Sequence, residues 1–134
     1  MGSDLVAEFP RAREVYERAS GVLGYDLAEL SFDDPDDNLN LTRYTQPALL
    51  AHQVACLTVF RELAGNVEPF VAAGHSLGEY TALVAAGALT LEDGVALVAE
   101  RGRLMSELGR GSMLATTLDF ETAKGLADKF YCGI

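Results

Sequence analysis

The chain has 134 residues, of which 49% are hydrophobic and 22% are charged, a composition typical of one globular domain and not of a disordered segment. Its 20 acidic residues outnumber its 10 basic residues, and the net charge of -10 argues against nucleic acid or an anionic membrane as a main partner. No apolar run approaches the roughly 20 residues of a membrane span, and the N-terminus lacks the pattern of a secretory signal, so we expect a cytoplasmic protein.

The first quarter of the chain is predicted to be helical. Residues 4–23 carry apolar side chains at helical spacing. Pro10 interrupts the pattern and is expected to open a second helix in its first turn, which Gly21 and Gly24 end. Residues 33–38 are acidic and rich in turn formers, so we expect a solvated loop there.

A long helix is predicted over residues 46–64. Thr45 is its expected cap, Pro47 lies in the first turn, and Gly65 follows the last residue. The segment is apolar around most of its circumference, which is typical of a helix buried inside a larger body. Cys56 is therefore expected to be a small core residue.

The second half of the chain mixes predicted strands with helices. Residues 68–73 form a short apolar run between turn residues, which predicts a buried parallel strand, and residues 112–118 predict a second strand. Together these elements indicate the α/β class. Helices are expected over residues 77–86, after a cap at Thr90, and between a cap at Asp119 and Phe130.

The motif G-x-S-x-G stands between the first predicted strand and the following helix, at Gly74–Gly78. In this setting the serine adopts a strained backbone conformation, and glycines on either side let strand and helix pack closely. The backbone N–H of Leu77, at the helix start, is free to stabilise an oxyanion. The pattern predicts that Ser76 is a nucleophile.

A nucleophilic serine needs a base, and the chain has only two histidines. His75 adjoins the serine and is expected to point elsewhere. His52 lies in the long helix, where a hydrogen-bonded structural histidine is the more common case. No histidine follows Ser76, so a self-contained α/β-hydrolase is excluded unless further residues belong to the protein.

Arg101 is the second candidate site residue. It falls within an apolar stripe, formed with Leu97, Leu104 and Leu108, on the helix that follows Thr90. A long arginine stem often packs along such a stripe while its guanidinium reaches solvent. Alternatively, the guanidinium faces inward and holds a substrate carboxylate through two hydrogen bonds. Both interpretations remain open from the residues alone.

Three blocks of sequence, Tyr44–Leu49, Ala73–Gly87 and Glu100–Met105, resemble the malonyl-CoA:acyl carrier protein transacylase family in their order and spacing. The resemblance implies a partial α/β-hydrolase-like core of the acyltransferase fold over residues 1–110, helix-rich in this chain. It also implies that residues 111–134 begin a small ferredoxin-like subdomain.

The resemblance further implies an activity, the transfer of malonyl from coenzyme A to acyl carrier protein in fatty acid biosynthesis. Ser76 would carry the acyl group, the Leu77 N–H would donate to the oxyanion, and Arg101 would pair with the malonyl carboxylate. His75 and Gln46 are candidate supporting residues. The two cysteines match no metal or redox spacing, and we expect no metal and no cofactor beyond the coenzyme A thioester substrate.

The chain also departs from the family pattern. Met1–Leu5 resembles the stretch just after the family's G-Q-G-S-Q loop, and the family's catalytic histidine corresponds to a position beyond Ile134. We therefore expect the N-terminal half of such an enzyme, shortened at both ends. Two alternatives remain: the acyltransferase domain of a polyketide synthase, and a non-catalytic fragment of the transacylase.

Overall fold

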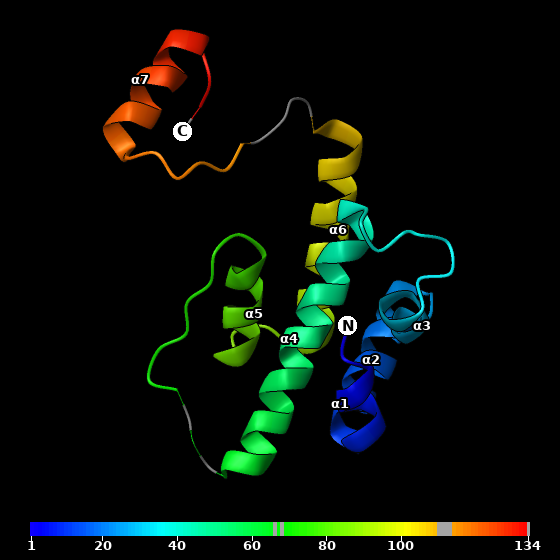
Figure 1. Ribbon diagram of the computed structural model, residues 1–134. Coiled ribbons are helices and arrows are strands. Elements are labelled where there is room, and N and C mark those ends of the chain that lie inside the picture. The colour runs from blue at the N-terminus through cyan, green and yellow to red at the C-terminus, as the bar shows by residue number, and fades with distance from the viewer. Residues whose placement is uncertain (66, 68, 110–113, 134) are drawn as a thin grey trace.

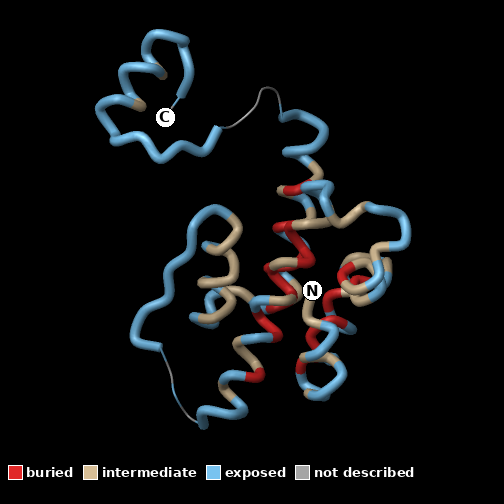
Figure 2. The backbone as a smooth tube through the Cα atoms, viewed as in Figure 1, coloured by how far each residue is buried: buried red, intermediate tan, exposed pale blue. Residues whose placement is uncertain are grey.

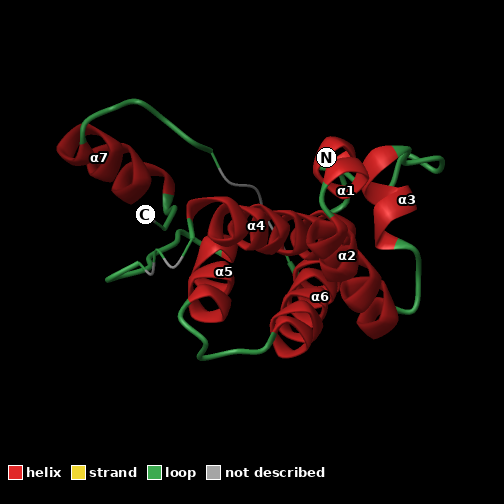
Figure 3. Cartoon of the chain, turned by 90° about the horizontal axis from the view of Figure 1, so that it is seen from below, coloured by secondary structure: helices red, strands yellow, loops and turns green. Residues whose placement is uncertain are grey.

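Seven α-helices and no β-strand form in residues 1–65, 67, 69–109 and 114–133, the part of the chain that this computed structural model describes (Figures 1 and 3). Helix α4 runs through the middle of the molecule, with α2 and α6 packed along it and α5 beside it. Helix α7 stands apart from the others in both views. The helices are α1 (Ser3–Glu8), α2 (Pro10–Leu23), α3 (Leu27–Phe32), α4 (Thr42–Ala64), α5 (Leu77–Ala85), α6 (Leu91–Leu108) and α7 (Phe120–Phe130).

The first two helices confirm the prediction made around Pro10. This residue begins α2, where its missing N–H costs no helical hydrogen bond. Helix α2 ends at Gly24, whose φ of 76° lies in the left-handed region that glycine adopts without strain. The expected end at Gly21 is wrong, because the helix continues through it to Leu23.

Helix α3 was not predicted. Asp26 begins it, and its carboxylate accepts a hydrogen bond from the Glu29 N–H at 2.9 Å. Six residues are too few for helical periodicity to stand out in a sequence. The loop over residues 33–38 is confirmed, and the Asp34 carboxylate organises it by accepting from the Asn38 N–H at 2.8 Å.

The long helix α4 begins earlier than predicted, at Thr42, and Thr45 is not its cap. The Thr45 hydroxyl instead donates to the carbonyls of Leu39, at 2.5 Å, and Leu41, at 3.0 Å. A threonine hydroxyl can either cap a helix or bond back to an earlier carbonyl, and the sequence does not distinguish the two. Pro47 consequently lies inside the helix.

The remaining helix ends agree with the sequence. Helix α4 stops at the residue before Gly65. The Thr90 hydroxyl caps α6 by accepting from the Asp93 N–H at 3.0 Å. The Asp119 carboxylate caps α7 by accepting from the Thr122 N–H at 3.0 Å. Each of these caps satisfies an N–H that the first helical turn leaves unpaired.

Both predicted strands are wrong within the described residues, because residues 69–73 and 114–118 form no strand. The other residues of these two predictions, 68 and 112–113, lie outside the described residues, as does the expected subdomain boundary at 110. A buried parallel strand requires hydrogen-bonded neighbours, and the described chain supplies none. The apolar segment is left uncovered: Phe70 is fully exposed and Val71 is 76% exposed.

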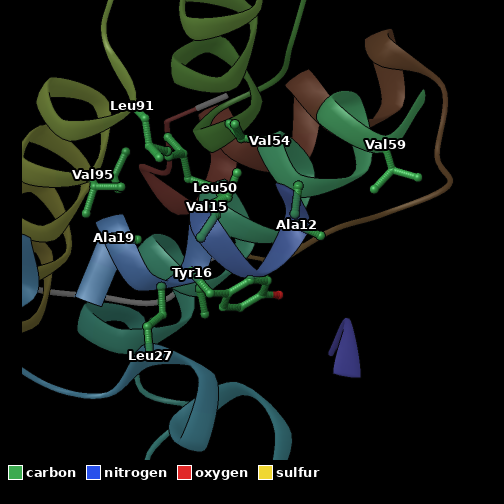
Figure 4. Close-up of a cluster of buried hydrophobic side chains, with 14 residues drawn as sticks. Ala12, Val15, Tyr16, Ala19, Leu27, Leu50, Val54, Val59, Leu91 and Val95 are labelled. Carbon is green, nitrogen blue, oxygen red and sulfur yellow. The ribbon is translucent and has the colours of Figure 1, made fainter. Parts of the chain in front are cut away.

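The hydrophobic core lies where α2, α4 and α6 meet. Figure 2 shows buried residues along these helices, and Figure 4 shows the buried side chains of the core. Cys56 does not belong to it: the thiol is exposed, while its neighbours Val54 and Ala55 on α4 are buried. In the described part of the chain, no helix has both the length and the apolarity needed to span a membrane. The largest fully buried side chains are Tyr16, Leu27, Leu50, Val95, Val98 and Pro47.

Tyr16 makes the core sensitive to alkaline pH. Its burial, and to a lesser extent Cys56 and Asp4, raise the pKa of Tyr16 to about 12. Because this folded-state pKa exceeds the unfolded value of about 10, Tyr16 favours folding fully below about pH 10 and progressively less as the pH rises toward about 12. We expect the free energy of unfolding to fall by roughly 1–2 kcal/mol through this window on account of Tyr16.

Urea denaturation at about pH 8 and at about pH 11 measures this fall. The matched variant is Tyr16→Phe, which keeps the ring and removes the ionisable hydroxyl together with its 3.0 Å bond to the Met1 carbonyl. It should be less stable than the parent at the lower pH but lose less stability between the two. An equal loss in both proteins would show that the Tyr16 hydroxyl does not control the alkaline transition.

Candidate active site

Ser76 lies on a sharp turn immediately before α5, and its backbone is strained. Its φ of 54° and ψ of -110° fall outside the regions that a residue with a Cβ adopts freely. Two short-range bonds close the turn: the Gly78 N–H donates to the His75 carbonyl at 2.9 Å, and the Glu79 N–H donates to the Ser76 carbonyl at 3.3 Å. The Ser76 residue is exposed, so an external acyl group can reach its hydroxyl.

The two motif glycines differ in importance. A Cβ placed on Gly74 would lie 2.0 Å from the backbone carbon and oxygen of Gly78 and 2.5 Å from the backbone nitrogen of Glu79. Only glycine fits there, because all three atoms belong to the backbone of the turn and its helix. A Cβ on Gly78 would meet nothing within 4 Å. The expectation that both glycines are needed for close packing therefore holds for Gly74 alone.

Leu77 is the first residue of α5, where helical geometry leaves the backbone N–H without a partner. Within the described ranges, no acceptor is hydrogen-bonded to this N–H. The N–H is next to the nucleophile in sequence and is available to an oxyanion that forms there. This position supports the prediction that Leu77 stabilises the oxyanion, which stays a prediction.

Arg101 on α6 reaches across to two of the other candidate residues, Ser76 and Gln46. Its Nη2 donates to the Ser76 Oγ at 3.0 Å, and its Nη1 donates to the Gln46 Oε1 on α4 at 2.6 Å. The guanidinium carbon also lies 5.9 Å from the centre of the Tyr80 ring. The structure therefore places the guanidinium at the site, although the stripe leucines Leu97, Leu104 and Leu108 are themselves exposed. Binding of a substrate carboxylate by Arg101 stays a prediction.

The structure does not bring either histidine to Ser76. His75 is exposed, and among the described residues its ring is hydrogen-bonded to none. The His52 ring lies between the Tyr16 hydroxyl and the Cys56 thiol. The distances are 3.4 Å from the Tyr16 oxygen to Nδ1 and 3.7 Å from the Cys56 Sγ to Nε2, as expected of a hydrogen-bonded structural histidine. Arginine stays protonated and accepts no proton, so the described site holds a nucleophile and a cation but no base.

An open groove of about 750 Å³ runs beside Ser76. One wall comes from α4, with Leu49, Gln53 and Leu57, and the opposite wall comes from α5 and residues 71–76. The Thr81 hydroxyl bridges the walls by donating to the Gln53 Oε1 at 2.5 Å. The groove is mostly apolar in its lining, and Ser76 is one of the residues that line it.

Sequence reasoning missed Met105, whose Sδ accepts a hydrogen bond from the Gln46 Nε2 at 3.4 Å. Two signals were available: Met105 ends the block Glu100–Met105 that resembles the family, and its spacing of four residues from Arg101 places both on one side of α6. No group of three or more histidine, cysteine, aspartate or glutamate side chains suited to a metal ion occurs in the described residues.

These features agree with comparisons against known proteins. The family model for the acyl transferase domain matches residues 1–134. The malonyl CoA-acyl carrier protein transacylase of Haemophilus influenzae is 48% identical over 118 residues, which are 86% of this chain and 38% of that protein. The chain thus spans about two fifths of the length of the curated relatives it matches.

Solved structures give the same result and confirm the acyltransferase fold. The malonyl CoA-acyl carrier protein transacylase of Clostridium perfringens superposes with a TM-score of 0.83 at 36% identity, over 96% of this chain and 42% of that one. A malonyl-transacylase solved in complex with its type II polyketide synthase acyl carrier protein superposes with a TM-score of 0.80 at 39% identity, over 96% and 44%. This chain belongs to the acyl transferase domain family.

Proposed function

We propose that the chain provides the nucleophile and the carboxylate-binding group of an enzyme that transfers malonyl from coenzyme A to acyl carrier protein in fatty acid biosynthesis. The observation that carries the proposal is the 3.0 Å contact between the Arg101 guanidinium and the hydroxyl of Ser76, on a strained turn. A cation at the nucleophile suits an acyl group that ends in a carboxylate.

In this mechanism the Ser76 Oγ attacks the thioester carbonyl, and the Leu77 N–H donates to the oxyanion that forms. The C–S bond then breaks, and coenzyme A leaves as the thiol with the proton that the serine gave up. Arg101 holds the malonyl carboxylate throughout. The phosphopantetheine thiol of acyl carrier protein next attacks the serine ester, which restores the Ser76 hydroxyl and completes a ping-pong cycle. No cofactor takes part.

The proton that Ser76 gives up needs an acceptor. We propose that this base is supplied by a group outside these 134 residues. The support is the absence of any described histidine hydrogen-bonded to Ser76, together with the span of about two fifths of the curated relatives. Removing the base from such a site costs about 10⁴ or more in rate. The chain alone should therefore acylate its serine slowly.

The finer fold assignment is also a proposal. We take residues 1–110 as part of an α/β-hydrolase-like subdomain and residues 111–134 as the beginning of a ferredoxin-like one. The separation of α7 from the other helices supports the division (Figure 1). The strained serine before α5 supports an α/β-hydrolase-like turn. We further propose a cytoplasmic location, where coenzyme A thioesters are consumed.

A polyketide role is the second candidate, since one similar structure is a malonyl-transacylase bound to a polyketide acyl carrier protein. Both roles share the serine and the arginine, so the site does not separate them. The neighbouring coding sequence does: an adjacent ketosynthase would favour the polyketide role, and its absence would favour a stand-alone transacylase. The remaining alternative, a fragment without catalytic activity, predicts no acylation under any condition.

The test is acylation of the purified chain by malonyl-CoA, followed by intact-mass measurement over hours. Imidazole is added in a parallel series because the exposed hydroxyl and the open groove admit a small external base. We expect one malonyl group per chain, attached slowly without imidazole and faster with it. Peptide mapping should place it on Ser76.

Ser76→Ala is the control, and it should remain unlabelled in both series. Equal labelling of this variant would show that malonyl attaches elsewhere and would overturn the proposal. The same conclusion would follow if a helical, soluble parent chain stayed unlabelled even with imidazole.

A further inference from the structure

Gln46 is a buried polar residue with both ends of its amide engaged. The residue is 6% exposed on α4, its Oε1 accepts from the Arg101 Nη1 at 2.6 Å, and its Nε2 donates to the Met105 Sδ at 3.4 Å. A flipped amide would point its donors at the guanidinium, which has no acceptor to offer. The amide orientation is therefore fixed, and it presents only its carbonyl oxygen to Arg101.

The guanidinium that Gln46 holds is not paired with a carboxylate in the described residues. Its partners there are an amide, a hydroxyl and the face of an aromatic ring. The two glutamates nearby on the same helix, Glu100 and Glu107, both pair with Arg103 instead. The local charge pattern leaves Arg101 free for an external anion.

The helix crossing beside this contact is close. A Cβ on Gly102, the residue after Arg101, would lie 2.9 Å from the Arg43 Cα and 3.0 Å from the Thr42 carbonyl oxygen. Helices α4 and α6 thus meet backbone to backbone at the residue next to Arg101. Gln46 lies one turn along α4 from that crossing, so its distance to the guanidinium is set by the two backbones.

We propose that Gln46 is a positioning residue that orients Arg101 through a neutral acceptor, and that its neutrality makes the site select acyl groups carrying a free carboxylate. A carboxylate at this position would hold the guanidinium equally well but would occupy its charge. The choice of glutamine over glutamate therefore preserves the selectivity that the Arg101 guanidinium provides. This inference rests on the proposed function and adds to it a residue that keeps Arg101 available to the substrate carboxylate.

The experiment compares the binding of malonyl-CoA and acetyl-CoA, which differ only in the carboxylate, by titration calorimetry. All variants carry Ser76→Ala, so that no acyl transfer disturbs the equilibrium. We expect Gln46→Glu to weaken malonyl-CoA binding by about tenfold, the equivalent of one charge-assisted hydrogen bond, and to leave acetyl-CoA binding within about twofold. The malonyl preference should fall by the same factor.

Two further variants test whether the effect depends on the position of the added charge and on the loss of the amide. Asn40→Asp adds the same charge at an exposed loop residue and should leave both affinities unchanged. Gln46→Met is neutral and of similar volume, and it should weaken malonyl-CoA binding alone, by less than Gln46→Glu. Circular dichroism and thermal melting confirm that each variant is folded.

The outcomes distinguish this inference from the proposed function. An unchanged malonyl preference in Gln46→Glu would overturn the role of Gln46, even if Ser76 is malonylated in the parent chain. Equal weakening of both ligands in Gln46→Met would assign Gln46 to packing and also overturn the role. A reduced preference in Gln46→Glu without any acylation of Ser76 would uphold carboxylate selection and reject the transfer activity.

Discussion

Gly74→Ala should slow malonylation of Ser76 by about 10²-fold or more. The added Cβ would lie 2.0 Å from the backbone carbon and oxygen of Gly78, so the turn must open for the alanine to fit. Opening it moves the serine hydroxyl away from the Arg101 guanidinium and from the start of α5. A misplacement of about 1 Å at a reacting atom costs about 10² in rate, and we expect at least that loss. The imidazole-assisted acylation rate, read by intact mass, is the measurement.

Gly78→Ala is the matched control, because it makes the same substitution at the other end of the motif. Its Cβ would meet nothing within 4 Å, and alanine favours a helix over glycine by about 0.5–1 kcal/mol. This variant should acylate at the parental rate and melt at the same temperature or slightly higher. Parental acylation in Gly74→Ala would mean that the turn is not the conformation in which Ser76 reacts.

The helix boundaries show which features of the fold can be predicted from a sequence. Pro10, Thr90 and Asp119 act on backbone groups within four residues of themselves, so their effect is contained in the local pattern. Thr45 shows the limit of this reasoning. Its hydroxyl had carbonyls available on the preceding turn, and the choice between capping and back-bonding depends on where the helix begins.

The failed strand predictions have a different cause. The apolar run that ends at Ala73 does encode burial, but a strand also needs neighbours with which to pair. The described residues contain no such neighbour, and Phe70 and Val71 stay exposed. An apolar pattern therefore reports the environment that a segment requires, and not whether the given residues supply it.

The candidate site was partly visible in the sequence. The motif around Ser76 and the stripe containing Arg101 lie 25 residues apart, and the 3.0 Å contact between them agrees with the inward interpretation. The contact of Gln46 with Met105 could not be predicted, because it depends on the crossing of α4 and α6. Gly102 permits the close approach of the two helices, and its importance appears only when a Cβ is placed on it.

Arg101→Met should remove the preference for malonyl-CoA while keeping acylation by acetyl-CoA. The methionine side chain is unbranched and uncharged, so it occupies the site but cannot bind a carboxylate. We expect malonylation of Ser76 to fall by about 10²-fold, the equivalent of roughly 2–3 kcal/mol, and acetylation to be unchanged or faster. Competition between the two thioesters for the parent and the variant, read as the mass ratio of the two adducts, gives the change in preference directly.

Arg103→Met makes the same substitution two residues along α6, where the side chain is exposed and paired with Glu100 and Glu107. Because that guanidinium is paired with the two glutamates and makes no described hydrogen bond to Ser76, the adduct ratio should stay at the parental value. The two variants lose the same charge, so a difference between them isolates the position of Arg101 from the net charge of the chain. Arg101→Met must also spare acetylation. If it slows both thioesters equally, the guanidinium maintains the shape of the turn and does not bind the substrate carboxylate.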